Sequence, residues 1–169
     1  MALHAPADDS LSAAPAAETL VLALGNPLRG DDGVGAAILA QLAEADLPPG
    51  VTLLDGGTPG LETALLLQGY RRAVIIDAAD MGLEPGQWAR FTRDAARLGS
   101  ADLRGTLHSA GLAEALSLGE ALGLLPEAVV IFGIQPAAVG WTSGLSAPVA
   151  AAVPAVGAAI LAELRGTAS

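Results

Sequence analysis

Strand-like apolar segments alternate along this chain with segments of helical periodicity, and this order constrains the fold more than any other feature. The strand-like segments are residues 19–25, 51–55, 72–80, 86–92 and 128–134. The helical patterns are residues 33–45, 60–70, 109–123 and 145–166. Strands joined through helices run parallel, and helices then cover both faces of their sheet. The order predicts a three-layer α/β fold with a twisted, mostly parallel five-stranded sheet.

Two segments depart from this regular pattern. Residues 86–92 follow the turn "LEPG" and alternate between apolar and polar, which predicts a half-buried antiparallel strand near an edge of the sheet. Pro154 lies inside the last helical pattern, where it lacks the N–H for a helical hydrogen bond. We therefore expect the closing helix to be kinked or interrupted there.

The domain organisation is simple. Residues 1–18 are rich in Ala, Pro, Asp and Ser, a composition typical of a disordered tail. The rest of the 169-residue chain shows no internal repeat, and 52% of the whole chain is hydrophobic, ample for a core. We expect one α/β domain over residues 19–166.

The composition also excludes several classes of function. The formal net charge is −10 and the eight basic residues form no stripe, which argues against a nucleic-acid partner. The chain has no cysteine, so a cysteine nucleophile, a disulfide and a thiolate metal site are all excluded. No uninterrupted apolar run is expected to span a membrane, and the N-terminus lacks the basic segment of a secretory signal. We expect a cytoplasmic protein with no membrane partner.

The turn "LGNPLRGDDGVG" at residues 24–35 joins the first strand to the first helix. A glycine-rich turn at this place usually holds a phosphate, because the helix N-terminus offers free N–H groups and a partial positive charge. Here the turn carries Asp31 and Asp32, which would repel an anion. The turn therefore predicts a different ligand.

Further acidic residues follow the other strands. Asp55 closes the second strand and Asp77 closes the core of the third, while His108 stands directly before the helix at 109. Ligands of such sheets bind outside the carboxyl ends of the strands, where neighbouring strand ends meet. We expect these side chains to lie at one rim of the sheet.

Each acid in the first two turns also has a purely structural interpretation. Asp31 is best explained as an N-cap that accepts helix N–H groups. Asp32 could be a first-turn acid favoured by the helix dipole, although one turn needs only one capping acid. Asp55 before "GGT" could only shape an Asx-type turn.

The residues after the third strand differ in how easily they are explained. Asp77 ends a fully apolar run, where an unpaired acid is costly, so it demands a partner. Asp80 is interpreted as a solvated loop acid. His108 alone is an ordinary helix-start residue, and Ser109 beside it lacks the Gly-x-Ser-x-Gly context of a nucleophile.

Together, two carboxylates and an imidazole converging on a cleft predict a divalent-metal site. Oxygen and neutral imidazole ligands suit Ni, Zn, Mn or Fe(II), and three protein ligands leave positions open for substrate. The same cluster could hold a sugar or the ribose of a nucleotide. Spacing alone does not decide between these ligands.

Five ordered motifs resemble the [NiFe]-hydrogenase maturation endopeptidases. They are "LALGNPLRGDDGVG", "LLDGGTPGLE", "VIIDAAD", "LHSAGLAEAL" and "VIFGIQP", and the resemblance covers about residues 19–165. The resemblance implies a mainly parallel sheet flanked by helices. It also implies a monomeric enzyme that removes a C-terminal extension from a hydrogenase large-subunit precursor once nickel has been inserted.

The resemblance assigns the site residue by residue. It implies that Asp32, Asp77 and His108 bind the nickel of the immature large subunit, with roles in catalysis that it leaves unresolved, and that other divalent metals can substitute. Asp32 stands where many members carry Glu. The supporting residues around the cleft are Asp31, Asp55, Gly56, Gly57 and Thr58.

Two other classes of protein remain as alternatives. A peptidyl-tRNA hydrolase has a similar Gly-Asn-Pro turn but requires an Arg-His-Asn-type segment, where this chain has "RGDDGVG". A non-catalytic nickel- or small-ligand-binding module is the second alternative, although the Gly-x-Gly-x-x-Gly spacing of a dinucleotide site is missing.

Overall fold

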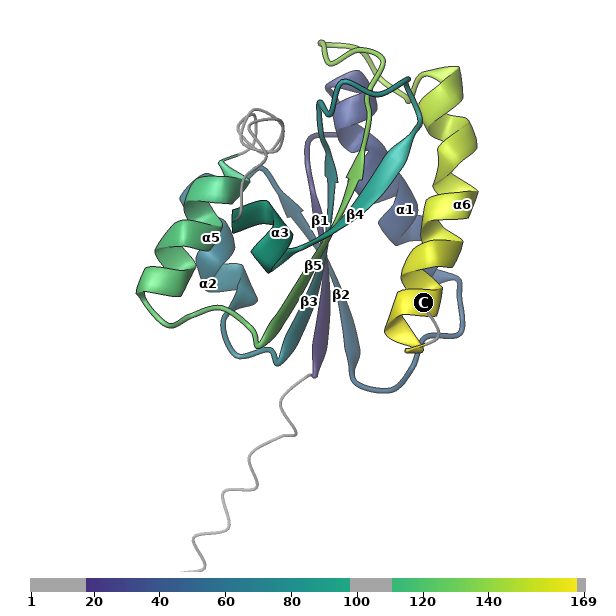
Figure 1. Cartoon of the computed structure of the whole chain (residues 1–169). Coiled ribbons are helices and arrows are strands. Elements are labelled where there is room, and N and C mark those ends of the chain that lie inside the picture. Colours follow the sequence, from purple (N-terminus) through teal and green to yellow (C-terminus); the bar gives the residue numbers. More distant parts are fainter. Residues whose placement is uncertain (1–17, 98–110, 167–169) are drawn as a thin grey trace, which may run out of the picture.

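The computed structural model describes residues 18–97 and 111–166. The five strands in these residues form one sheet, which helices flank (Figure 1). The strands are β1 (Thr19–Leu24), β2 (Val51–Gly57), β3 (Arg72–Ala78), β4 (Trp88–Thr92) and β5 (Ala128–Ile134). Their order in the sheet is β2-β1-β3-β5-β4, and β4 alone is antiparallel to its neighbour. The predicted mostly parallel sheet and its antiparallel edge strand are confirmed.

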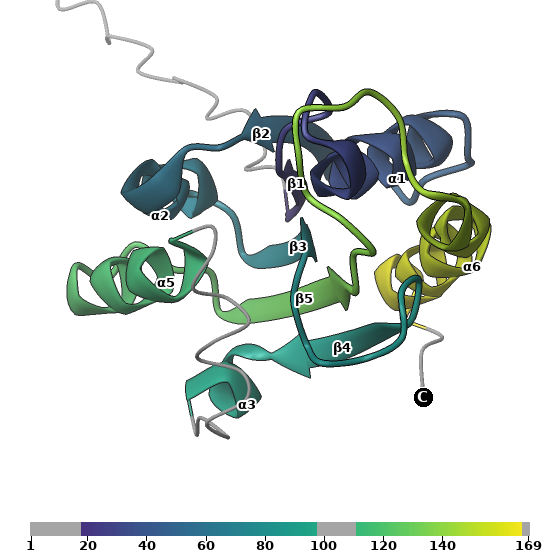
Figure 2. The same ribbon diagram turned by 90° about the horizontal axis from the view of Figure 1, so that it is seen from above.

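Helices cover both faces of the sheet, as predicted. The α-helices are α1 (Val34–Ala43), α2 (Thr63–Leu67), α3 (Arg93–Arg97), α5 (Leu112–Ala121) and α6 (Ala147–Leu164). Figure 2 shows α1 and α6 on one face and α2 and α5 on the other. Short 3-10 turns, η1 (Gly30–Gly33) and η2 (Gly60–Glu62), precede α1 and α2. The short α3 has no counterpart in the prediction, and the predicted tail lies outside the described residues except for Glu18.

Alternation along the strands divides the core into two layers. In β1, Leu20 and Leu22 pack with α2 and α5, whereas Val21 between them packs with α1 and α6. In β3, Ile75 faces α5 and Ile76 faces α1. Because successive side chains of a strand point to opposite faces, Asp77 lies on the same face as Ile75, which α2 and α5 cover.

Two glycines hold α1 close to the carboxyl ends of β1 and β3. A Cβ on Gly35 would lie 2.7 Å from the carbonyl oxygen of Leu24 and 3.2 Å from that of Ile76. Gly25 has a φ of +115°, and a Cβ there would lie 1.9 Å from the carbonyl oxygen of Asp32. The turn between β1 and α1 therefore has to pass directly over the ends of the two central strands.

Helix α6 is not interrupted at Pro154, contrary to one of the two outcomes expected from the sequence. It runs through Pro154 without interruption, since Pro154 and Ala150, whose carbonyl loses its helical partner, are both exposed. It is also long and apolar enough to cross a membrane by length and composition alone, with a mean hydropathy of 1.8. In the structure, however, its Val149, Val156 and Ile160 are fully buried in the core with α1, so it serves as a core helix.

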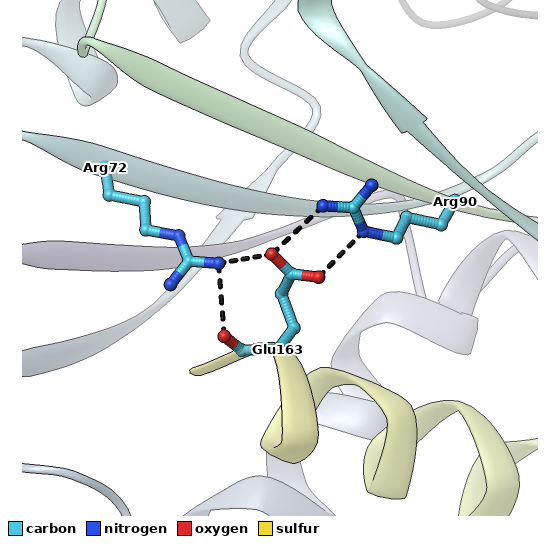
Figure 3. Close-up of polar contacts among 3 residues, drawn as sticks. All are labelled: Arg72, Arg90 and Glu163. Carbon is cyan, nitrogen blue, oxygen red and sulfur yellow. Dashed lines mark hydrogen bonds and ion pairs between the residues drawn. The ribbon is translucent and has the colours of Figure 1, made fainter. Parts of the chain in front are cut away.

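A buried carboxylate fastens the end of α6 to the sheet. Glu163 is 5% exposed and binds two guanidinium groups, those of Arg72 on β3 and Arg90 on β4 (Figure 3). Arg90 Nε donates to Glu163 Oε2 at 2.7 Å, and the Arg72 guanidinium donates to both the side chain and the carbonyl of Glu163. The hydrogen bonds from Arg90 and the positive charges of both arginines lower the pKa of Glu163.

We predict that Glu163→Gln lowers the free energy of unfolding by about 2 kcal/mol, because it removes the charge that two part-buried guanidinium groups share. The lowered pKa means that this contribution is present above the ordinary pKa of a glutamate and is lost as the pH falls through the lower folded value. Urea unfolding at pH 7 and pH 3 checks both expectations.

The matched control is Glu127→Gln. Glu127 also pairs with an arginine, Arg71, at 3.6 Å, but both side chains are at least 69% exposed. Exposed pairs contribute little, so the control should change the stability by less than about 0.5 kcal/mol. Equal losses in the two variants would show that Glu163 does not fasten α6.

Candidate functional site

A pocket of about 780 Å³ opens at the carboxyl ends of the parallel strands, where the sequence predicts the site. Its walls are the turn after β1, the loop after β2, the residues after β3 and the loop that joins β5 to α6. Figure 2 shows the β5–α6 loop running past the ends of β1 and β3 beside the β1–α1 turn. Four of the five strands thus deliver residues to one cavity.

Asp31 does not cap the helix, contrary to the sequence-based interpretation. Neither η1 nor α1 has a side-chain cap. The Asp31 carboxylate is 1% exposed and accepts four hydrogen bonds from the β5–α6 loop instead. The donors are the N–H groups of Ala137, at 2.8 Å, and Ala138, and both the N–H and the hydroxyl of Ser146.

These contacts make Asp31 the clamp that holds the pocket wall. Burial works to raise the pKa of Asp31, but the hydrogen bonds from Ser146, Ala137 and Ala138 together outweigh it and hold the pKa below its usual value. Backbone bonds reinforce the clamp, since Gly30 N–H donates to the Thr142 carbonyl at 2.7 Å. Asp31 therefore supports the cleft, in a way that the sequence did not reveal.

Asp32 faces the pocket. Its side chain is half-buried, lines the cavity and accepts a hydrogen bond from the Asn26 N–H at 2.8 Å through Oδ2. The two neighbouring acids thus have different surroundings, because Asp31 points into the β5–α6 loop and Asp32 points into the cavity. The remaining lone pairs of Asp32 are available to a ligand.

Asp77 does not line the cavity itself but is buried at the end of β3, directly before the lining residue Ala78. It is 2% exposed, and its Oδ1 is the one buried side-chain oxygen or nitrogen in the described part of the chain that lacks a hydrogen-bond partner. Burial first, and the negative charge of Asp32 second, raise the pKa of Asp77 to about 7, against a smaller opposing effect of the Ala78 N–H. A buried carboxylate beside another carboxylate needs either a proton or a cation.

His108, the third predicted ligand, lies outside the described residues. Within residues 18–97 and 111–166, no three His, Cys, Asp or Glu side chains come together as a metal site. Gly111, the first described residue after His108, lies beside the pocket. A Cβ on Gly111 would lie 3.6 Å from Cα of Gly60, which lines the cavity. The three-ligand set therefore stays a prediction.

The "DGGT" residues divide between the pocket and its outer side. Gly57 and Thr58 line the cavity. Asp55 is exposed, and its Oδ1 accepts the Gly57 N–H at 3.1 Å, which is the Asx-type turn considered above. Gly56 lies in β2 beside β1, and a Cβ on it would lie 2.8 Å from Leu22 Cδ1. Asp55 and Gly56 thus shape the loop that carries the two lining residues.

Three further residues line the pocket, namely Asp80, Gln135 and Arg29, and none of them was assigned to the site from the sequence. Asp80 is exposed, in agreement with its interpretation as a solvated loop acid, but it also lines the cavity, and its Oδ1 accepts from Gln135 Nε2 at 3.2 Å. Gln135 is 7% exposed, and its Oε1 accepts the Met81 N–H at 2.6 Å. Arg29 supplies the cation of the lining. Gln135 directly follows a predicted strand, so the strand-end rule that selected Asp77 could have found it.

We predict that Asp31→Ala releases the β5–α6 loop and lowers the free energy of unfolding by about 2 to 4 kcal/mol, because it leaves several buried donors unpaired. Hydrogen exchange of residues 136–146 should become faster than in the wild type. Asp55→Ala is the control, since it removes one exposed hydrogen bond. Unchanged exchange of the loop in Asp31→Ala would contradict the clamp.

We predict a pH-dependent gain of stability for Asp77→Asn. The folded protein keeps the proton of Asp77 up to about pH 7, whereas an unfolded aspartate loses it near pH ~3.9. Wild-type stability therefore falls as the pH rises between these two values and stays low above the upper one. The asparagine carries no charge, so the variant should exceed the wild type by about 2 to 4 kcal/mol at pH 8 and by little at pH 4.

Urea unfolding across this pH range measures the difference, with Asp55→Asn as the exposed control. A pH-independent difference between Asp77→Asn and the wild type would mean that the Asp77 carboxylate is compensated in the folded protein.

The comparison with known families agrees with this architecture. Residues 37–163 match the model of the hydrogenase maturation protease family, a range that contains Asp77 and begins after Asp32. The chain is 36% identical over 143 residues to the hydrogenase expression/formation protein HupD of Rhizobium leguminosarum bv. viciae, covering 83% of this chain and 71% of that protein. It is 35% identical over 132 residues to HupD of Bradyrhizobium diazoefficiens, covering 77% of this chain and 69% of the relative.

Solved structures show the same fold. The hydrogenase maturating endopeptidase HybD from E. coli superposes with a TM-score of 0.74 at 28% identity, covering 89% of this chain and 93% of that one. The [NiFe] hydrogenase maturation protease HybD from Thermococcus kodakarensis gives a TM-score of 0.67 at 28% identity, covering 90% and 99%. The chain therefore belongs to the hydrogenase maturation protease family and is a peptidase of this α/β fold.

Proposed function

We propose that this peptidase removes the C-terminal extension of a [NiFe]-hydrogenase large-subunit precursor after nickel insertion. In this proposal Asp32, Asp77 and His108 recognise the nickel that the precursor already carries. The metal is thus part of the substrate, and another divalent metal of similar ligand preference can take its place. Membership of a peptidase family displaces the peptidyl-tRNA hydrolase alternative.

The observation that carries the proposal is the uncompensated carboxylate of Asp77. Its Oδ1 is buried without a hydrogen-bond partner among residues 18–97 and 111–166, and the negative charge of Asp32 repels it. A divalent cation between the two carboxylates would remove both penalties at once. Oxygen ligands of this kind suit a borderline metal such as nickel when an imidazole joins them.

Chain connectivity supports His108 as the third ligand. Gly111 lies against the pocket residue Gly60, and three residues span at most about 10 Å even when fully extended. Helix α5, which His108 precedes, covers the face of the sheet on which Asp77 lies. The three-residue separation between His108 and Gly111 is therefore compatible with the proposed third ligand.

The arrangement supports two roles for the residues in hydrolysis. A metal ion at the rim would polarise the scissile carbonyl or lower the pKa of a bound water. Asp77, whose pKa is raised to about 7 by burial and by Asp32, matches the protonation equilibrium of a general base that works at neutral pH. A third role is alignment of the peptide in the cleft through its metal.

The partner follows from the family. The relatives in Rhizobium and Bradyrhizobium are hydrogenase expression and formation proteins, and the proposed partner is the large-subunit precursor itself. We propose that the peptidase acts as a monomer in the cytoplasm, where a large subunit would receive its nickel before export or assembly.

We predict that Asp77→Ala, Asp32→Ala and His108→Ala each slow cleavage of a nickel-loaded precursor by about a hundredfold or more, since each removes a ligand that stabilises the reacting complex. Mass spectrometry of the precursor measures the cleavage. The control is Asp46→Ala, an exposed acid in the α1–β2 connection whose side chain is remote from the pocket. Circular dichroism shows whether each variant is folded.

Three outcomes would contradict parts of the proposal. Wild-type cleavage by a folded Asp77→Ala variant would overturn the assignment of the site. Equal cleavage of nickel-loaded and nickel-free precursors would overturn recognition of the metal. Binding of the loaded precursor without cleavage would identify the chain as a non-catalytic nickel-binding module.

A further inference from the structure

We infer that an apolar rim beside the pocket, formed by Leu28, Val139 and Trp141, is the docking platform for an apolar surface of the precursor protein. Leu28 lies in the β1–α1 turn, and the other two residues lie in the β5–α6 loop. The inference rests on the proposed function and names the surface through which the substrate protein is held while its C-terminal segment enters the pocket.

The first argument is the exposure of these side chains. Trp141 is 81% exposed, Leu28 64% and Val139 45%. Val139 and Trp141 line the pocket, whereas Leu28 does not line it but directly precedes the lining residue Arg29 in the sequence. Exposed apolar side chains that gather at one opening mark a binding surface, whereas isolated ones are ordinary.

The second argument is that the platform is rigid. The Asp31 carboxylate binds Ala137, Ala138 and Ser146, so the loop that carries Trp141 is fixed at both of its ends. In between, Gly30 N–H donates to the Thr142 carbonyl, which ties the loop to the β1–α1 turn that carries Leu28. A surface ordered in advance loses little entropy when a partner binds, and this favours affinity.

The third argument concerns the side chains themselves. The Arg29 guanidinium lies 5.6 Å from the centre of the Trp141 ring, in a cation–π contact that orients the indole and occupies one of its faces. Tryptophan and arginine are the residues that most often dominate the energy of protein interfaces. An exposed indole that contacts an arginine at the mouth of the pocket is suited to anchor a partner.

The occupant is identified by the size and charge of the pocket. A cavity of about 780 Å³ holds a short segment of peptide, on the scale of pockets for small ligands, so a protein that inserts such a segment has to rest on the rim. The pocket presents two acids, Asp32 and Asp80, against one base, Arg29, so its formal charge is negative, while the rim is apolar. The matching partner therefore carries a cation on the inserted segment and an apolar surface around it, rather than a second copy of this acidic chain.

The test separates binding from catalysis. We expect Trp141→Ala to raise KM for the nickel-loaded precursor about tenfold or more and Leu28→Ala severalfold, with kcat within twofold of the wild type in both. Thermal unfolding should be unchanged, because both side chains are largely exposed. The matched control is Leu122→Ala, since Leu122 is 60% exposed at the end of α5 and does not line the pocket, and its KM should equal that of the wild type.

The outcomes distinguish this inference from the proposed function. If the wild type and Leu122→Ala cleave the precursor and Trp141→Ala has an unchanged KM, the docking platform is overturned while the peptidase function stands. If the wild type does not cleave, both are overturned. If ultracentrifugation shows a dimer of the wild type that Trp141→Ala dissociates, the platform is an interface between two copies, which also overturns the inference.

Discussion

The repulsion between two carboxylates at the end of the central strands is the constraint on which this site depends. Asp77 is buried with an unpartnered oxygen, and Asp32 adds negative charge from the half-buried turn opposite. Close packing brings Asp32 near Asp77, because Gly25 and Gly35 let the β1–α1 turn pass directly over the ends of β1 and β3. The protein thus keeps a local penalty that only a proton or a cation relieves.

The neighbouring acid solves a different problem. Asp31 is as inaccessible to solvent as Asp77, yet its carboxylate receives four hydrogen bonds, so its charge is stabilised. The contrast shows that burial alone does not define a functional acid. A carboxylate with four hydrogen bonds fixes structure, whereas a buried carboxylate with one oxygen unpaired among the described residues is a candidate for binding a ligand. One dipeptide therefore supplies both the wall of the pocket and one of its charges.

Much of this could be predicted from sequence because it follows from periodicity. Buried parallel strands are continuous apolar runs, so the five strands, their mostly parallel arrangement and the exit of Asp77 at the rim were readable in advance. The role of Asp31 was not, since its partners lie more than a hundred residues away in the chain. The contact between Gln135 and Asp80 was equally unpredictable, because it joins residues from two loops, although the position of Gln135 after a predicted strand could have marked it as a candidate.

Pro154 shows the opposite error. Local propensity predicts a kink or a break, but α6 is one continuous helix whose Val149, Val156 and Ile160 pack in the core, while Pro154 and Ala150 are exposed. The ion pairs of Glu163 with Arg72 and Arg90 then fasten the end of that helix to the sheet. Helix α6 is therefore anchored at both ends, at its C-terminal end through Glu163 and at its N-terminal end through the bonds of Ser146 to Asp31.

The central claim is that the Asp77 carboxylate is uncompensated in the folded protein without metal. The most direct test is a pH titration of the Asp77 carboxyl ¹³C resonance in the metal-free protein. The account predicts a midpoint near pH 7, as burial and the charge of Asp32 require. A midpoint at or below the value of an ordinary aspartate, about 3.9, would show that Asp77 already has the partners it needs, and would contradict the account.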